Sequence, residues 1–100
     1  MSLPVRATSR AMRQMREADA WWRENRKAAR QTFGNELAGV LALVAESPAM
    51  GQPYLATPVE RVRRVLLPTT RYHVYYQAEG DRITVLGVWH ASRGGGPPLA

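Results

Sequence analysis

Two histidines and a few arginines are the residues of this chain whose side chains could take part in catalysis or hold an anion. His73 and His90 could exchange protons, because a histidine titrates near neutral pH. Arg64 and Arg93 could hold a phosphate or a carboxylate, since a guanidinium makes planar, bidentate contacts. Nothing in the sequence brings the two histidines together, and a single strand histidine more often has a structural role. These four residues are therefore catalytic candidates only if the protein is an enzyme.

The absence of cysteine and the charge of the chain limit the remaining function classes. Without cysteine there are no disulfides, thiolate metal ligands or cysteine nucleophiles, and we expect no metal and no cofactor. The formal net charge is +6, carried by thirteen arginines and the single Lys27. Such a field favours an acidic partner, either nucleic acid or an acidic protein, although arginine-rich codon usage would give the same composition.

Basic and aromatic residues of the C-terminal half are the candidates for binding a target. They are Arg63, Arg64, Arg71, Tyr75, Trp89 and Arg93. Arg63 and Arg64 must point to opposite faces if they lie on one strand, so at most one of them belongs to a given surface. Solvated arginines on a strand are the alternative interpretation. Trp89 could pack in the core or line the groove in which a partner docks.

Two helices are predicted before these residues. Thr8 or Ser9 can cap a first helix, whose apolar face would consist of Met12, Met15, Ala18 and Trp22. Asn25 is the predicted cap of a second helix, which Pro48 ends and whose apolar residues are Ala29, Phe33, Leu37, Val40, Leu41 and Val44. Gly34 and Gly39 within that helix suggest that another backbone approaches closely. The result is a helical hairpin over roughly residues 9–46.

Strands are predicted after residue 61, because β-branched and aromatic residues replace the helical spacing. The three segments are residues 62–67, 71–78 and 82–90, with a tight turn at Glu79-Gly80-Asp81 between the last two. A short edge strand is expected at residues 5–7. The glycines and prolines of residues 94–100 should take the chain away from the sheet as a flexible tail.

These elements predict one α+β domain over residues 1–100, because the helical hairpin cannot be stable alone and must bury its apolar face against the sheet. The expected architecture is a short N-terminal strand and a two-helix hairpin packed on a C-terminal antiparallel sheet, in the order β-α-α-β-β-β. No apolar stretch is long enough to span a membrane, and no signal peptide is evident. We therefore expect a cytoplasmic protein without a membrane partner.

The order of elements and several local strings resemble the RelE/ParE toxin superfamily over nearly the whole chain. The strings are Val62-Arg63-Arg64-Val65-Leu66, Arg71-Tyr72-His73-Val74-Tyr75-Tyr76, the Glu79-Gly80-Asp81 turn, Trp89-His90-Ala91-Ser92-Arg93, and Glu46-Ser47-Pro48-Ala49-Met50-Gly51. The resemblance implies the toxin half of a type II toxin-antitoxin pair, of the kind associated with plasmid stabilisation. It also implies a cognate acidic antitoxin, ParD-like or similar.

The superfamily contains two chemistries, and the resemblance has to be weighed against both. RelE-like members are metal-independent endoribonucleases that cut mRNA on the ribosome by means of basic residues. Arg64 and Arg93 match two of these residues, whereas Leu66 and His73 stand where a lysine and an arginine are usual, and no tyrosine follows Arg93. ParE-like members lack the nuclease residues and are associated with inhibition of DNA gyrase by binding. We favour the ParE-like interpretation, with the RelE-like nuclease as the alternative.

Two other classes remain open at this point. A non-enzymatic nucleic-acid-binding module would use the arginines against phosphates, and its affinity would fall steeply with salt. A structural or adaptor protein would have neither toxicity nor a cognate antitoxin. Neither class accounts for the strings shared with the toxin superfamily.

Overall fold

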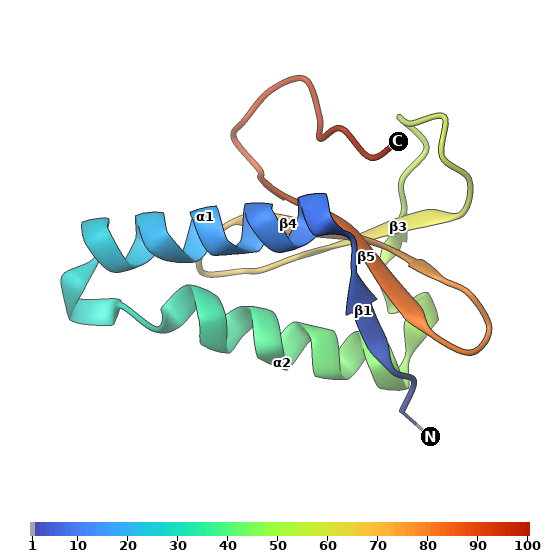
Figure 1. The fold of residues 1–100 in the computed structure, drawn as a ribbon, viewed down its shortest axis with the longest axis horizontal. Helices are drawn as coiled ribbons and strands as arrows, with labels where there is room; N and C mark the ends of the chain where they lie inside the picture. The colour runs from blue at the N-terminus through green and yellow to red at the C-terminus, as the bar shows by residue number, and fades with distance from the viewer. Residues whose placement is uncertain (1) are drawn as a thin grey trace.

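The computed structural model describes residues 2–100, which form two helices and a five-stranded sheet (Figure 1). The helices and 3₁₀ turns are α1 (Ser9–Asn25), η1 (Lys27–Ala29), α2 (Thr32–Glu46) and η2 (Pro48–Met50). The strands are β1 (Val5–Ala7), β2 (Gln52–Pro53), β3 (Val62–Leu66), β4 (Tyr72–Ala78) and β5 (Ile83–His90). Within residues 2–100, no helix is long and apolar enough to cross a membrane.

The predicted α+β architecture is confirmed, with two additions to the sheet. Its strand order is β1-β5-β4-β3-β2, and β3, β4 and β5 pair antiparallel as predicted. The first addition is β1, which joins the edge of the antiparallel strands by pairing parallel with β5. The second is β2, a two-residue strand on the edge of β3 that the sequence did not predict.

The boundary between the helices differs from the prediction. Asn25 is the last residue of α1 rather than the cap of α2, and its side-chain amide donates to the Trp21 carbonyl at 2.8 Å. The turn η1 follows, and α2 begins only at Thr32. The apolar spacing continued through the turn because Ala29 belongs to η1, so periodicity alone could not reveal the break.

Helix α1 starts as predicted but buries a different face. The Thr8 hydroxyl oxygen accepts a hydrogen bond from the Ala11 backbone N–H at 3.1 Å, which caps the helix. The core face consists of Ala11, Met15, Ala18 and Trp22. Met12 was assigned to the core wrongly, because its side chain is 47% exposed. A small residue was needed where α1 comes close to the sheet. Alanine is only weakly hydrophobic, so it does not stand out in the spacing of apolar residues from which the buried face was predicted.

Both helices pack on one face of the sheet, which we call the helix face. Its buried residues come from both helices and from the central strands: Ala11, Ala18, Phe33, Leu67, Val74, Val85 and Val88. Gln14 of α1 completes the ladder at the β5 edge, since its side-chain carbonyl accepts from the Val88 N–H at 2.9 Å. This hydrogen bond ties α1 to β5.

The opposite surface of the sheet, which we call the open face, is covered in its centre by two loops. The segment of residues 94–100 runs beside the loop of residues 54–61 (Figure 1), and Leu99 packs against buried Tyr75 and Leu86. Arg10 donates to the Pro98 and Ala100 carbonyls at 2.8 and 2.9 Å. Residues 94–100 form no strand, as expected, but they fold back over the open face instead of extending away from it. The cause is a contact across the whole chain that no local pattern signals.

A β-bulge in β5 sets which of its side chains lie on each face. Tyr75 pairs with Gly87 but Tyr76 pairs with Val85, so Leu86 is an extra residue with no partner on β4. A bulge interrupts the alternation of side chains along a strand. As a result Val85 and Val88 both lie on the helix face, while Trp89 lies on the open face.

The connection from α2 to the sheet is fixed by buried Tyr76. Its hydroxyl donates to the Pro48 carbonyl at 2.7 Å and accepts from the Gly51 N–H at 3.0 Å. The two hydrogen bonds hold η2 against β4 at a point where the backbone of Gly51 touches the tyrosine ring. By contrast, the close approach expected at Gly39 is absent, since nothing lies within 4 Å of the position of a Cβ there.

Candidate functional site

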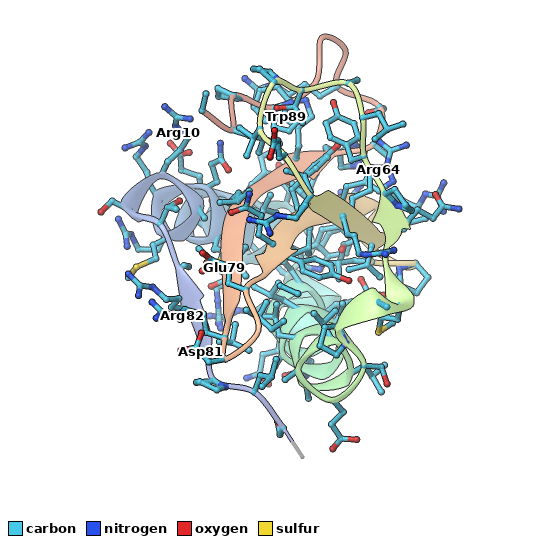
Figure 2. The ribbon with its side chains drawn as sticks, turned by 90° about the vertical axis from the view of Figure 1, so that its right-hand side faces the viewer. Arg10, Arg64, Glu79, Asp81, Arg82 and Trp89 are labelled. Atoms are coloured by element: carbon cyan, nitrogen blue, oxygen red, sulfur yellow. The ribbon has the colours of Figure 1, made fainter. Side chains whose placement is uncertain are left out.

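The open face carries three of the six predicted target-binding residues, Arg64, Tyr75 and Trp89. The register places Arg64 opposite Tyr75, and His73 between Leu66 and Trp89, all on this face. Arg64 lies over the Tyr54 ring at 5.2 Å and donates to the Tyr75 hydroxyl at 3.4 Å. In Figure 2 Arg64 and Trp89 both lie on the side of the sheet away from α2.

Tyr75 does not reach the surface in this structure. Its side chain is 2% exposed, and Tyr54 and Leu99 pack against it. The Tyr54 ring meets the Tyr75 ring edge-on at 4.9 Å between centroids. The residue expected to bind a target therefore supports the loops that cover the open face.

His73 lies in a cationic part of the open face. Partial burial lowers the pKa of His73, and the positive charges of Arg64 and Arg71 lower the pKa further. Each effect penalises the imidazolium form, so the ring is neutral at pH 7. A neutral histidine among arginines can accept a proton only weakly, which disfavours it as a general base.

His90 lies on the other side of the sheet. It pairs with Tyr72, whose ring it meets edge-on at 5.0 Å between centroids, and Tyr72 packs in the helix-face core. The Ser92 backbone N–H donates to His90 Nδ1 at 3.1 Å, and the Ser92 hydroxyl lies 2.8 Å from the same nitrogen. The two histidines thus lie on opposite faces of the sheet, because His90 pairs with Tyr72 and consecutive residues of a strand point to opposite faces.

Arg93 and Trp89 form a stacked pair at the end of β5. The guanidinium carbon lies 3.8 Å from the Trp89 ring centroid, a cation–π arrangement. The Trp89 indole N–H donates to the Arg93 carbonyl at 3.1 Å, which fixes the ring relative to the turn. This pair presents a positive charge on a flat aromatic support and is well suited to contacting an acidic surface.

Arg63 and Arg71 have different surroundings from the open-face arginines. Arg63 donates to the Gly51 carbonyl at 2.7 Å and so helps to hold the connection before β2, which is a structural role. Arg71 is exposed and has a φ of 68°, a left-handed conformation that side chains other than glycine and asparagine rarely adopt. Its backbone is fixed by hydrogen bonds with Leu67 and Ala91.

Two adjoining hollows lie beside the end of α1. The first, of about 460 Å³, is called here the indole basin, and it is lined by Trp21, Trp22, Arg26, Thr69, Thr70, Arg71, Tyr72 and His90. The second, of about 210 Å³, shares Trp21, Tyr72 and His90 with it and adds Trp89 and Arg93. His90 and Arg93 therefore meet in one hollow, whereas His73 lines neither.

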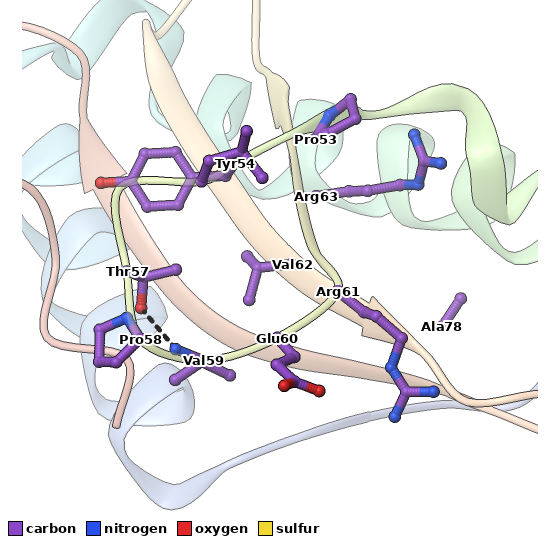
Figure 3. Close-up of a pocket in the computed structure, with 11 residues that line it drawn as sticks. Pro53, Tyr54, Thr57, Pro58, Val59, Glu60, Arg61, Val62, Arg63 and Ala78 are labelled. Atoms are coloured by element: carbon purple, nitrogen blue, oxygen red, sulfur yellow. Dashed lines mark hydrogen bonds between the residues drawn. The ribbon is translucent and has the colours of Figure 1, made fainter.

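A larger hollow of about 520 Å³ lies elsewhere, between the loop of residues 54–61 and the edge of β3. Figure 3 shows Val62 within the span of the loop, while Arg61 and Arg63 extend away from it. Its ionisable groups, Glu60, Arg61 and Arg63, do not converge on a common point. Size alone therefore does not identify the functional site, and we base the site on the residues around Trp89, His90 and Arg93.

Glu36 organises one wall of the indole basin and was not singled out from the sequence. Its carboxylate accepts hydrogen bonds from the Thr69 N–H at 2.7 Å and from the Thr70 N–H and hydroxyl at 3.0 and 2.8 Å. Burial alone would raise the pKa of Glu36, but the hydrogen bonds from Thr70 and Thr69 outweigh it and lower the pKa. The turn before β4 is thus tied to α2.

Replacing Glu36 by glutamine should destabilise the protein by roughly 1–3 kcal/mol, because one carboxylate oxygen becomes an NH₂ group that cannot accept. Since the folded pKa of Glu36 lies below its unfolded value, its contribution is complete above the unfolded pKa and disappears as pH falls through the folded pKa. Urea unfolding of both proteins at pH 7 and near pH 3 measures this. The difference between them should shrink at the lower pH, and a constant difference would contradict the role of the charge.

Comparisons with known proteins place the whole fold in one group of toxins. The family described as "ParE toxin of type II toxin-antitoxin system, parDE" matches residues 5–94. The toxin fold of the chromosomal ParDE system of P. aeruginosa aligns with a TM-score of 0.72 at 12% identity, covering 91% of this chain and 98% of that chain. E. coli RelE in the free state gives 0.59 at 21% identity, covering 92% and 86%. The M. tuberculosis RelBE2 complex gives 0.63 at 17% identity, covering 92% and 95%.

No curated protein matches the chain. At these identities the solved structures establish the shared fold alone. The family match is more informative, because it extends from β1 to the turn after Arg93 and so includes every candidate residue. This chain belongs to the ParE toxin family of type II toxin-antitoxin systems, within the RelE/ParE superfamily.

Proposed function

We propose that this toxin inhibits DNA gyrase by binding it and does not cleave RNA. The observation that carries the proposal is the separation of His73 from His90, which lie on opposite faces of the sheet. General acid-base catalysis of phosphodiester cleavage needs a base, an acid and a charge-stabilising group around one phosphate. A binding inhibitor needs only an exposed, rigid surface.

Arg93 stacked on Trp89 is the centre of the proposed target-binding surface, and Arg64 extends it along the open face. The formal net charge of +6 favours encounter with an acidic partner surface. An arginine supported by an aromatic ring loses little conformational freedom on binding, which suits an interface anchor. Arg71 belongs to the same proposed surface, to which it contributes a solvent-exposed positive charge next to β4.

The proposal includes a cognate acidic antitoxin that neutralises the toxin, and a cytoplasmic location where both would meet gyrase. Ion pairs at the rim of an interface contribute little affinity, so the antitoxin must also cover apolar surface. Such surface is present on both helices, since the Met12 and Leu43 side chains are 47% and 57% exposed. The family match to a toxin of paired systems supports a partner of this kind.

Purified toxin should inhibit gyrase supercoiling, and Arg93→Ala should raise the concentration needed by about tenfold or more. Truncating a charged interface group costs about 2 kcal/mol or more, and each 1.4 kcal/mol is tenfold. Arg82→Ala is the matched control, because Arg82 pairs with Asp81 at the far hairpin turn and should leave inhibition unchanged. Figure 2 shows how far this turn lies from Trp89.

The RelE-like alternative is tested on the same preparations by mapping transcript ends in a translation-dependent system. Cleavage within translated codons that disappears in His73→Ala or Arg93→Ala, together with unimpaired supercoiling, would refute the binding mechanism. Equal loss of inhibition in Arg93→Ala and Arg82→Ala would instead contradict the proposed surface. The ribosome and its mRNA would be the target in the first case.

A further inference from the structure

We propose that the indole basin binds a nucleotide, with the nucleobase stacked on the indole rings and the phosphate held by Arg71 and Arg26. Of the residues that line the basin, only Arg71 also belongs to the proposed target-binding surface. Four kinds of observation lead to the nucleotide site. They concern the aromatic walls, the charge, the backbone of Arg71 and the size of the hollow.

The aromatic walls offer an accessible platform of two indole rings, whose planes are inclined at 53° to each other. Trp21 and Trp22 lie with ring centroids 6.1 Å apart, and the Trp21 side chain is 47% exposed. The Trp22 ring is fixed, because its indole N–H donates to the Ala29 carbonyl at 2.8 Å. Every nucleobase has a π-face, and stacking on an aromatic side chain contributes about 1–3 kcal/mol per base.

The charge of the basin selects an anion. Its eight lining residues include two arginines and no carboxylate. The Arg26 guanidinium carbon lies 5.3 Å from the Trp21 centroid and 5.7 Å from the Trp22 centroid, so a positive charge already occupies the rim of the platform. The carboxylate of Glu36 touches the same wall but is engaged by the hydrogen bonds from Thr69 and Thr70. An aromatic cation is therefore excluded, and an aromatic anion fits.

Arg71 is held in a costly backbone conformation with its guanidinium available. A φ of 68° at a non-glycine residue costs on the order of 1 kcal/mol and is often found at ligand sites. Within residues 2–100 its side chain makes no hydrogen bond or ion pair, whereas its backbone N–H and carbonyl are both bonded. Glycine would fit this backbone better, so an arginine at this position supports a role for its free guanidinium in binding.

The size of the basin suits a small ligand rather than a partner helix. A volume of about 460 Å³ lies within the usual range for small-molecule sites. The adjoining hollow shares Trp21, Tyr72 and His90 and contains both Arg93 and Glu17, so it can accept a neighbouring base. The same nucleotide chemistry can thus come from a free nucleotide or from one nucleotide of a single strand.

The test is titration of the full-length protein with AMP and, separately, with a five-nucleotide single-stranded DNA, followed by NMR of backbone and indole N–H groups. We expect saturable shifts at Trp21, Trp22 and residues 69–71 with at least one of them. Arg71→Gly should weaken binding about tenfold or more, since a charged hydrogen-bonding group is removed. Its stability should equal or exceed that of the wild type, because glycine relieves the positive φ, so lost binding cannot be attributed to unfolding.

Arg61→Gly is the matched control. Arg61 is also an exposed arginine with a positive φ, 58°, but it lies in the 54–61 loop outside the basin and should leave affinity unchanged.

Binding of AMP assigns the site to free nucleotides, and binding of the oligonucleotide alone assigns it to single strands. Absence of both, equal affinity in Arg71→Gly, or equal weakening in Arg61→Gly overturns the proposal. Shifts at the basin with an acidic peptide and with neither nucleotide would make it a protein-docking site instead. Gyrase inhibition by the wild-type protein is measured alongside, so failure here is separable from failure of the proposed function.

Discussion

Gly51→Ala is expected to lower the free energy of unfolding by about 3 kcal/mol or more, because an added methyl group would overlap a buried ring. A Cβ at Gly51 would lie 2.6 Å from the Tyr76 hydroxyl oxygen and 2.9 Å from both Tyr76 Cε1 and the Arg64 carbonyl oxygen. Tyr76 is completely buried and cannot move without losing its hydrogen bonds to Pro48 and Gly51. The backbone of Gly51 is extended, so space rather than conformation imposes the glycine.

Urea unfolding measures this cost, with Gly39→Ala as the matched control. Gly39 lies on α2 with open space around its Cβ position, so alanine there should stabilise the protein by up to about 1 kcal/mol. Tyr76→Phe alone should cost about 1–3 kcal/mol, because it leaves the Pro48 carbonyl and Gly51 N–H without partners. Combined with Gly51→Ala it should cost less than the sum, since the closest clash is removed. If Gly51→Ala were as stable as the wild type, this close contact would be wrong.

Phe33→Ala should destabilise the protein by about 3–5 kcal/mol. Phe33 is 1% exposed on the sheet side of α2, and its ring meets the Tyr72 ring edge-on at 5.1 Å between centroids. Truncation removes the apolar contact and leaves a cavity under Tyr72, which lines both the indole basin and its adjoining hollow. The substitution therefore weakens the wall of the proposed site as well as the core.

Leu43→Ala is the control for position on α2, because the Leu43 side chain is exposed and should contribute within about 0.5 kcal/mol. Phe33→Leu should fall between the two, since it retains part of the buried volume. For a domain of this size each kcal/mol shifts the melting temperature by roughly 4–8 °C, so thermal unfolding separates the three variants. A Phe33→Ala variant that melts with Leu43→Ala would show that Phe33 does not anchor the hairpin.

The sequence predicted the order of elements well because each strong periodic pattern corresponds to a buried face. Residues 62–67, 71–78 and 82–90 contain β3, β4 and β5 with errors of one residue at their ends. The pattern misled where the buried residue is small. Ala11 faces the sheet and Met12 faces solvent, because α1 comes too close to β5 for the larger side chain.

The faces of β5 could not be derived from alternation. Counting in twos from Ile83 would place Val85, Gly87 and Trp89 together, with His90 opposite. The extra residue Leu86 shifts the count, so Trp89 lies on the face opposite Val85 and His90 lies with Tyr72. A bulge depends on how two strands fit around α1, and no single residue type announces it.

The long-range contacts of Glu36 and Arg10 could not be predicted for a different reason. Glu36 reaches a turn 33 residues away, and Arg10 reaches the carbonyl of Pro98, 88 residues away. Both look like ordinary surface charges in the sequence, since only the folded chain brings their partners near. The left-handed backbone of Arg71 is equally invisible, because arginine carries none of the preference for that conformation shown by glycine or asparagine.

The bulge at Leu86 also bears on how genes for such proteins can change length. Because Leu86 has no partner on β4, an in-frame loss of its codon would leave Tyr76 opposite Val85 and Tyr75 opposite Gly87. Trp89 and His90 would keep their faces, and the packing of Leu86 in the cluster with Val62 and Tyr75 would be lost. An alignment gap of one residue at this point is therefore compatible with an unchanged surface. A gap after Gly87 would instead turn the His90 side chain to the face where Trp89 lies, and the Trp89 side chain to the opposite face.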